Sequence, residues 1–137
     1  NSGYMIVQYS AASMVSENKV LAHPASVDSI PSSANQEDMV SMGTTAARKS
    51  GWIVQNTLSV LADELLTACQ AIDIRRRLNT HGQGISPVHQ KVFDRVRKDI
   101  AFYETDRELW QDIQAAEKLV RSGELLEIVH ETVADFE

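Results

Sequence analysis

The protein chain has 137 residues, of which 43% are hydrophobic and 23% are charged. This composition is typical of a globular protein and argues against intrinsic disorder, because enough apolar side chains are present to form a core. The length fits one domain of roughly 100–200 residues or a piece of a larger protein. The 13 Lys and Arg residues against 19 Asp and Glu residues give a net charge of −6. That charge disfavours a nucleic-acid partner, since phosphates bind basic surfaces.

The single cysteine and the hydropathy pattern bear on the cellular compartment. Cys69 cannot form an internal disulfide, which is compatible with a reducing cytoplasm. No stretch reaches the roughly 18–20 uninterrupted apolar residues that span a bilayer, and residues 4–15 lack the basic n-region of a signal peptide. We therefore expect a cytoplasmic protein without a membrane partner. The sequence begins with Asn1 and not with Met, so we expect either a processed start or missing upstream sequence.

Helical periodicity dominates the first part of the sequence. Residues 3–18 are small and apolar nearly all round, which predicts a helix buried among other helices. Residues 22–34 hold two prolines and four serines without a helical period, and they predict an ordered extended loop. Helical spacing then returns over residues 36–77, which would form a helix roughly 60 Å long unless Gly43 or Gly51 bends it. A helix of this length needs partner subunits to cover it.

Shorter helices are predicted over residues 86–137. Ser86 before Pro87 has the pattern of an N-cap followed by proline at the first helical position. A stripe of apolar residues spaced by four follows and predicts a core or interface face: Val88, Val92, Val96 and Ile100. Residues 105–108 (Thr-Asp-Arg-Glu) have the pattern of a capping box, and Gly123 separates the last two helices.

No run of alternating apolar and polar residues demands a sheet, so the predicted class is all-α, a bundle built on a long helix. We expect one helical unit over residues 1–137. Its parts are a helix plus extended loop at 1–35, the long helix at 36–77, a turn at 79–84 and the shorter helices at 86–137.

Several arrangements of reactive side chains argue against a metal centre. The four histidines are scattered along the chain, and Cys69 lacks the second cysteine of a CxxC pair. His130-Glu131 begins like a zinc-protease motif, but position 134 is Ala where that motif needs a second His. We therefore expect no metal site.

The polar stretch from residue 18 to residue 43 is the unusual part of the chain. It is rich in His, Pro, Ser, Asn and Gln, and it leads into Glu37-Asp38 at the predicted beginning of the long helix. Two readings stay open on the residues alone. The two carboxylates could serve only as charges that stabilise the helix N-terminus. Alternatively, Asn35, Gln36 and Glu37 project amide and carboxylate groups into a site.

A resemblance to a known family adds to this reading. The stretches that carry it are Asn-Ser-Gly-Tyr-Met-Ile at 1–6, Ser-Glu-Asn-Lys at 16–19, His-Pro-Ala-Ser-Val-Asp-Ser-Ile-Pro at 23–31, Ser-Ala-Asn-Gln-Glu-Asp at 33–38 and Val-Ser-Met-Gly at 40–43. Together with Ala-Ile-Asp at 71–73 they closely resemble the aromatic amino acid ammonia-lyases, above all those that act on histidine. The specific match covers about residues 1–77.

The resemblance implies an all-helical homotetramer and an electrophile, 4-methylidene-imidazol-5-one, made from an internal Ala-Ser-Gly. It implies elimination of ammonia from an amino acid, which for L-histidine gives trans-urocanate in histidine catabolism. No Ala-Ser-Gly occurs in the 137 residues. We therefore expect the C-terminal part of such an enzyme, inactive alone and associated with the remainder of the lyase chain.

The resemblance also assigns roles to four residues. Glu37 falls where histidine-specific members carry Glu and phenylalanine- or tyrosine-specific members commonly carry Gln, and it would contact the substrate imidazole or act as a base. Asn35 and Gln36 would supply hydrogen bonds, and Met5 would line the pocket for the substrate ring.

The sequence departs from the pattern at Met39, where histidine lyases usually have His. The alternatives of a phenylalanine or tyrosine ammonia-lyase, a 2,3-aminomutase or a non-catalytic helical assembly module therefore remain open.

Overall fold

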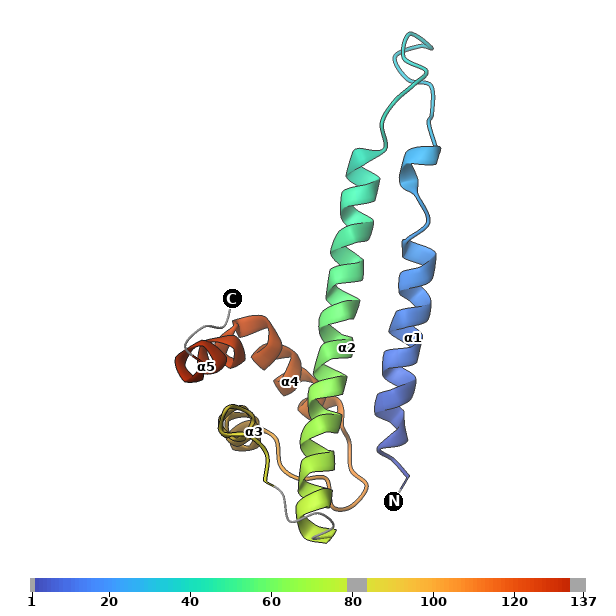
Figure 1. The fold of residues 1–137 in the computed structure, drawn as a ribbon. Helices are drawn as coiled ribbons and strands as arrows, with labels where there is room; N and C mark the ends of the chain where they lie inside the picture. Colours follow the sequence, from blue (N-terminus) through green and yellow to red (C-terminus); the bar gives the residue numbers. More distant parts are fainter. Residues whose placement is uncertain (1, 79–83, 134–137) are drawn as a thin grey trace. The chain divides into compact units, whose positions relative to one another are not determined.

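The computed structural model describes residues 2–78 and 84–133, and within these ranges the chain is helical (Figure 1). One 3-10 turn and five α-helices follow one another without a named strand in the described part: α1 (Met5–Leu21), the 3-10 turn η1 (Ala25–Val27), α2 (Gly43–Leu78), α3 (Pro87–Asp99), α4 (Trp110–Ser122) and α5 (Glu124–Thr132). The predicted all-α class is confirmed. None of the helices in the described ranges is long and apolar enough to cross a membrane.

The contacts between residues group the chain into two compact units, each described by itself below. Unit 1 comprises Asn1–Ala11 and Leu58–Glu137, and unit 2 comprises Ala12–Thr57. The division falls within α1 and α2. The expectation of one helical unit over the whole chain stays a prediction.

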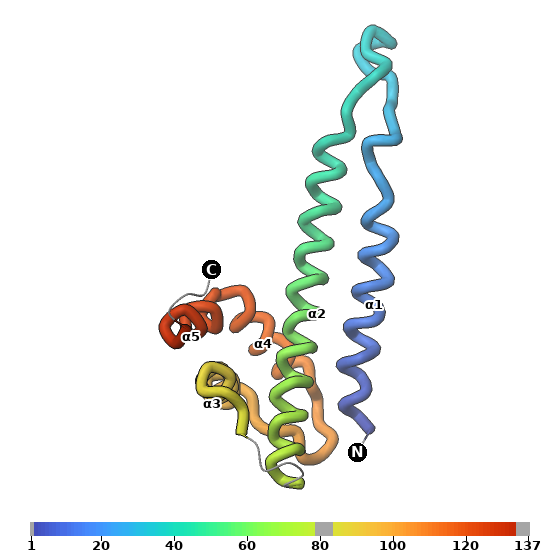
Figure 2. Tube along the Cα trace, viewed as in Figure 1, coloured from blue at the N-terminus to red at the C-terminus, as the bar shows by residue number. Residues whose placement is uncertain are grey.

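The long helix is present, but it begins later than its periodicity indicates. α2 runs unbroken from Gly43 to Leu78, so it is about 54 Å long, and Gly51 does not interrupt it (Figures 1 and 2). The predicted start at residue 36 is wrong, because the backbone before Gly43 is already paired elsewhere. Glu37 exchanges two backbone hydrogen bonds with Ser32, and Ser29 holds the next residues.

Ser29 makes both of these bonds through its hydroxyl. The hydroxyl donates to the Asp38 carbonyl oxygen at 3.0 Å and accepts from the Val40 N–H at 2.9 Å. Both backbone groups are therefore satisfied in an extended segment, without the carbonyl-to-amide pairing of a helical turn.

The main hydrophobic core lies in unit 1, where α2 supplies one wall and the shorter helices supply the rest. Its buried residues are Ala62, Leu66, Cys69, Phe93, Val96, Ile100, Ala116 and Leu119. Val96 and Ile100 of the predicted stripe are almost fully buried, whereas Val88 and Val92 are half-buried. Burying each large apolar side chain contributes roughly 1.5–3 kcal/mol, so this core anchors the short helices to α2.

Two of the predicted helix boundaries are confirmed and a third is wrong. Ser86 caps α3 by accepting from the His89 N–H, and Gly123 ends α4 in the left-handed conformation at φ 79°. The capping box at 105–108 does not form, because α4 begins at Trp110. Within this stretch the Arg107 N–H donates to the Tyr103 hydroxyl at 3.1 Å. The predicted turn at 79–84 lies largely outside the described residues.

Candidate functional site

The residues to which the resemblance assigns roles lie in two places. Asn35, Gln36 and Glu37 form one tight turn in unit 2, and Met5 lies at the beginning of α1 in unit 1. The turn is closed by a backbone bridge between Ser32 and Glu37, with N···O distances of 2.7 Å and 3.3 Å.

The turn has an unusual backbone. Ser33, Ala34 and Asn35 all have positive φ angles, of 51°, 54° and 67°. A left-handed conformation costs a residue with a side chain roughly 1–2 kcal/mol, and Asn tolerates it better than Ala. The bridge between Ser32 and Glu37 compensates this cost and brings the three candidate residues together at the tip of the loop.

Glu37 is exposed, and its carboxylate accepts a hydrogen bond from the Ser32 hydroxyl at 3.3 Å. Its expected position at the N-terminus of the long helix is wrong, since α2 begins only at Gly43. The helix dipole therefore does not explain why a carboxylate stands here, because that effect fades within the first turn. What the geometry offers instead is a carboxylate held by Ser32 at a closed turn that also carries Asn35 and Gln36.

Sequence reasoning missed the two serines that hold this turn. Ser32 supports the Glu37 carboxylate, and Ser29 fixes the strand-like segment that follows it. A signal was present, since serine hydroxyls in irregular segments often bond to nearby backbone groups in place of regular secondary structure.

Met5 lines a groove of about 740 Å³ in unit 1. The groove lies between the first turns of α1 and the second half of α2, and its surface is mostly apolar. It is lined by Tyr4 just before α1, by Met5, Val7, Gln8 and Ala11 from α1, and by Val60, Asp63, Glu64, Thr67, Ala68 and Ala71 from α2. The Met5 side chain is 52% exposed, so it can still contact another group. An apolar, flexible side chain of this kind suits a contact with an aromatic ring.

Asp63 is the unexpected residue in this groove. It is 2% exposed, and neither carboxylate oxygen has a hydrogen-bond partner of normal geometry among the described residues. Burial raises its pKa from 3.8 to about 6, although the Ser10 hydroxyl lies near enough to favour the charged form, and the Glu117 carboxylate raises the pKa further. Sequence reasoning did not single out Asp63.

Metal and thiol chemistry find little support in the described ranges. No group of three or more His, Cys, Asp or Glu side chains in them is arranged to hold a metal ion. Cys69 is buried in the core, and burial raises the pKa of its thiol, which keeps it a neutral packing group and not a nucleophile.

The described structure defines the class as an all-α protein with one long helix, α2, and a polar loop before it. The model of the family described as aromatic amino acid lyase matches residues 1–98. The chain belongs to the aromatic amino acid lyase family, which confirms the resemblance noted above.

Individual relatives agree with this assignment. The chain is 53% identical over 137 residues to histidine ammonia-lyase 1 of Fusobacterium nucleatum subsp. nucleatum, covering 100% of the chain and 26% of that relative. It is 53% identical over 134 residues to the histidine ammonia-lyase of Clostridium tetani, covering 97% of the chain and 26% of that relative. The chain thus spans about a quarter of the length of the curated relatives it matches.

Solved structures show the same fold. The histidine ammonia-lyase of Trypanosoma cruzi superposes with a TM-score of 0.86 at 44% identity, over 96% of this chain and 25% of that chain. A tyrosine aminomutase from Streptomyces globisporus also gives a TM-score of 0.86, at 33% identity, over 100% of this chain and 25% of that chain. The backbone fold is therefore shared by members with different activities.

Proposed function

We propose that this chain is part of a histidine ammonia-lyase, an enzyme that eliminates ammonia from L-histidine to give trans-urocanate. One observation carries the proposal. Several relatives that are histidine ammonia-lyases are 47–53% identical to this chain over almost its whole length. The tyrosine aminomutase structures have a similar fold but are only 33–34% identical. Sequence identity, and not the fold, therefore favours histidine over tyrosine as the substrate.

Glu37 is the residue that we propose to meet the substrate. Glu37 is exposed at the closed turn that also carries Asn35 and Gln36. A carboxylate accepts a hydrogen bond from an imidazole N–H and can also take up a proton, whereas a carboxamide can only do the former. The three side chains would bind and orient the substrate, and Met5 would pack against its ring.

The electrophile of the family, 4-methylidene-imidazol-5-one, needs an Ala-Ser-Gly that these 137 residues do not contain. The 137 residues therefore cannot themselves form this electrophile. We propose that another part of the complete protein supplies it, that the protein is a homotetramer and that it acts in the cytoplasm. This chain would contribute substrate contacts to a site that it shares with the remainder of the enzyme.

The experiment that tests the proposal measures urocanate formation from L-histidine by the complete protein at the ultraviolet band of urocanate. In Glu37→Gln, we expect the turnover of histidine to fall more than tenfold, which corresponds to about 1.4 kcal/mol or more of transition-state stabilisation. Asp28→Asn removes a carboxylate from the same exposed loop and serves as the matched control, with turnover near that of the wild type. Wild-type kinetics in Glu37→Gln would remove Glu37 from the mechanism.

Met39 favours a second candidate, because histidine lyases usually have His at this position. In that alternative the complete protein is a phenylalanine or tyrosine ammonia-lyase or a 2,3-aminomutase. Formation of coumarate or β-tyrosine from tyrosine, with no product from histidine, would establish it. A non-catalytic helical assembly module is the remaining alternative. Mass spectrometry of the source protein would support the module if the native product has the size of this chain.

A further inference from the structure

The segment between α3 and α4 is held in place by a buried glutamine of α2. The Gln70 amide donates to the Tyr103 carbonyl oxygen at 2.8 Å, and the Gln70 side-chain oxygen accepts from the Tyr103 N–H at 3.1 Å. Gln70 is 8% exposed and Tyr103 is 7% exposed. Both polar ends of the amide are therefore satisfied inside the protein, which fixes the backbone of Tyr103 in one position.

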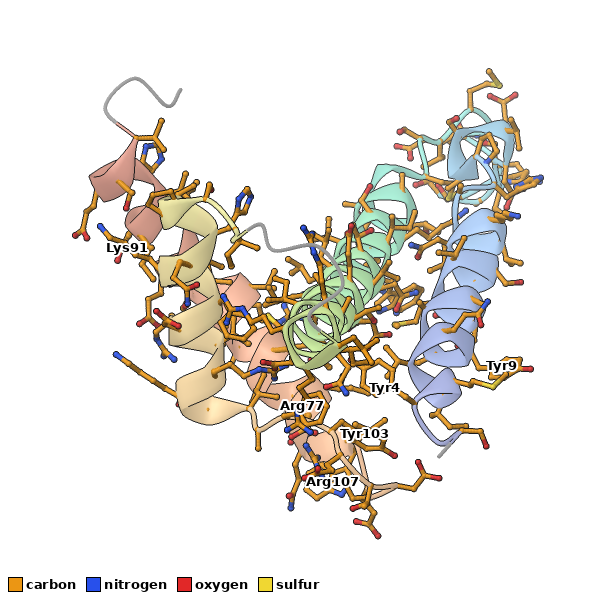
Figure 3. All side chains as sticks on the ribbon, turned by 60° about the horizontal axis from the view of Figure 1, so that its bottom comes forward. Tyr4, Tyr9, Arg77, Lys91, Tyr103 and Arg107 are labelled. Atoms are coloured by element: carbon orange, nitrogen blue, oxygen red, sulfur yellow. The ribbon has the colours of Figure 1, made fainter. Side chains whose placement is uncertain are left out.

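Tyr103 in turn arranges the residues that follow it. Its hydroxyl accepts from the Arg107 N–H at 3.1 Å and lies 3.2 Å from a carboxylate oxygen of Asp106, to which it donates. Its ring meets the Tyr4 ring edge to face, with 5.3 Å between the centroids. In Figure 3, Tyr103 and Arg107 lie close together on the segment that leads to α4, and Tyr4 marks the beginning of α1.

Asp106 connects this segment to the first turn of α1. The same carboxylate oxygen accepts a hydrogen bond from the Gly3 N–H at 3.2 Å. A Cβ atom at Gly3 would lie 2.7 Å from the Tyr103 hydroxyl and 3.0 Å from Asp106, so no other residue fits here without a shift. The Gly3 carbonyl then accepts from the Ile6 N–H at 3.1 Å, in the turn that leads into α1 at Met5.

From this chain of contacts we infer that Asp106 is a positioning residue for Met5, fixing the first turn of α1 so that the Met5 side chain is presented to the substrate ring. The inference rests on the proposed function, because Met5 is a substrate contact only in that proposal. All residues in the chain of contacts belong to unit 1. Asp106 itself does not touch the substrate. Its effect is indirect, because the backbone that it holds sets where the Met5 side chain lies.

The test is a double-mutant cycle on the complete protein, with kcat and KM for histidine measured separately. Asp106→Ala removes the acceptor of the Gly3 N–H, and we expect KM to rise about tenfold while kcat stays within about threefold of the wild type. Asp106→Asn keeps an oxygen acceptor and should restore KM to within about threefold of the wild type. When Met5 is already Ala, Asp106→Ala should change KM by less than about twofold, since the contact that it positions is gone.

Controls separate positioning from a general loss of stability. Glu131→Ala removes an exposed carboxylate on α5 and should leave both kinetic constants unchanged. If Asp106→Ala does not fold, Gly3→Ala replaces it in the same cycle, because it disturbs the same contact from the other side.

Several outcomes would overturn the inference. These are an unchanged KM in Asp106→Ala, no rescue by Asp106→Asn, or an effect of Asp106→Ala that is equally large in the Met5→Ala background. Failure of the proposed function is a different result, namely a wild-type protein that forms no urocanate. If that protein acts on tyrosine or phenylalanine, the same cycle is measured with that substrate.

Discussion

Asp63 allows a quantitative prediction about stability and pH. The carboxylate is buried in the groove between α1 and α2 without a hydrogen bond of normal geometry, and burial raises its pKa from 3.8 to about 6. The charged form is therefore unfavourable in the folded protein and favourable in the unfolded chain. We expect Asp63→Asn, which has nearly the same shape but no charge, to stabilise the fold at neutral pH.

The size of the effect follows from the two pKa values. Between them the folded state binds more protons than the unfolded state, so the free energy of unfolding of the wild type falls as pH rises. The cost is almost absent below pH 3.8, grows between pH 3.8 and pH 6 and levels off at about 3 kcal/mol above pH 6. The advantage of Asp63→Asn over the wild type should follow the same curve.

Thermal or urea unfolding of the complete protein at a series of pH values from 4 to 8 measures this difference. Asp28→Asn, at an exposed position, is the matched control and should give a difference close to zero throughout. The reasoning is refuted if the advantage of Asp63→Asn does not vary with pH, or if the variant is less stable than the wild type at pH 7.5.

Four further substitutions test separate features of the fold by unfolding measurements. Ala34→Gly should stabilise the loop by about 0.5–1 kcal/mol because it relieves the strain of a left-handed Ala, and a loss of stability would contradict this. Gly123→Ala should lower the free energy of unfolding by about 1 kcal/mol, because Gly123 has a φ of 79°. Gly51→Ala should raise it by about 0.5–1 kcal/mol, because Gly51 lies inside α2 with open space around the added Cβ. Equal effects of the two substitutions would refute this distinction. Asp73→Asn should cost about 1–3 kcal/mol because it leaves the partly buried Arg97 guanidinium without its charged partner at 2.8 Å, and a neutral result would show that this pair is dispensable.

The features that the sequence predicted well depend on local physics. The period of apolar residues within α2, the N-cap at Ser86 and the left-handed Gly123 all arise from residues within a few positions of one another. The predicted helix starts are wrong where a side chain outside the helix forms a hydrogen bond with the backbone. The Ser29 hydroxyl accepts from the Val40 N–H before α2, and the Tyr103 hydroxyl accepts from the Arg107 N–H within the predicted capping box.

For the candidate site, the family resemblance located the turn that carries Glu37, but not the way the turn is built. The contact between Gly3 and Asp106 joins residues 103 positions apart, and no spacing rule reveals it. Asp63 escaped notice for a similar reason. An aspartate on a helix is normally solvated, and only the packing of α1 against this part of α2 turns it into a buried carboxylate.

Gln70 shows how finely such an interior is matched to one functional group. Its nitrogen points at a carbonyl oxygen and its oxygen points at an N–H, so the amide must be present in one orientation. Glutamine is among the thermolabile side chains, since its amide can be hydrolysed to the carboxylate of glutamate. At this position the product would place a carboxylate oxygen against the Tyr103 carbonyl oxygen, where the amide nitrogen now donates at 2.8 Å, so hydrolysis would destabilise the interior of unit 1.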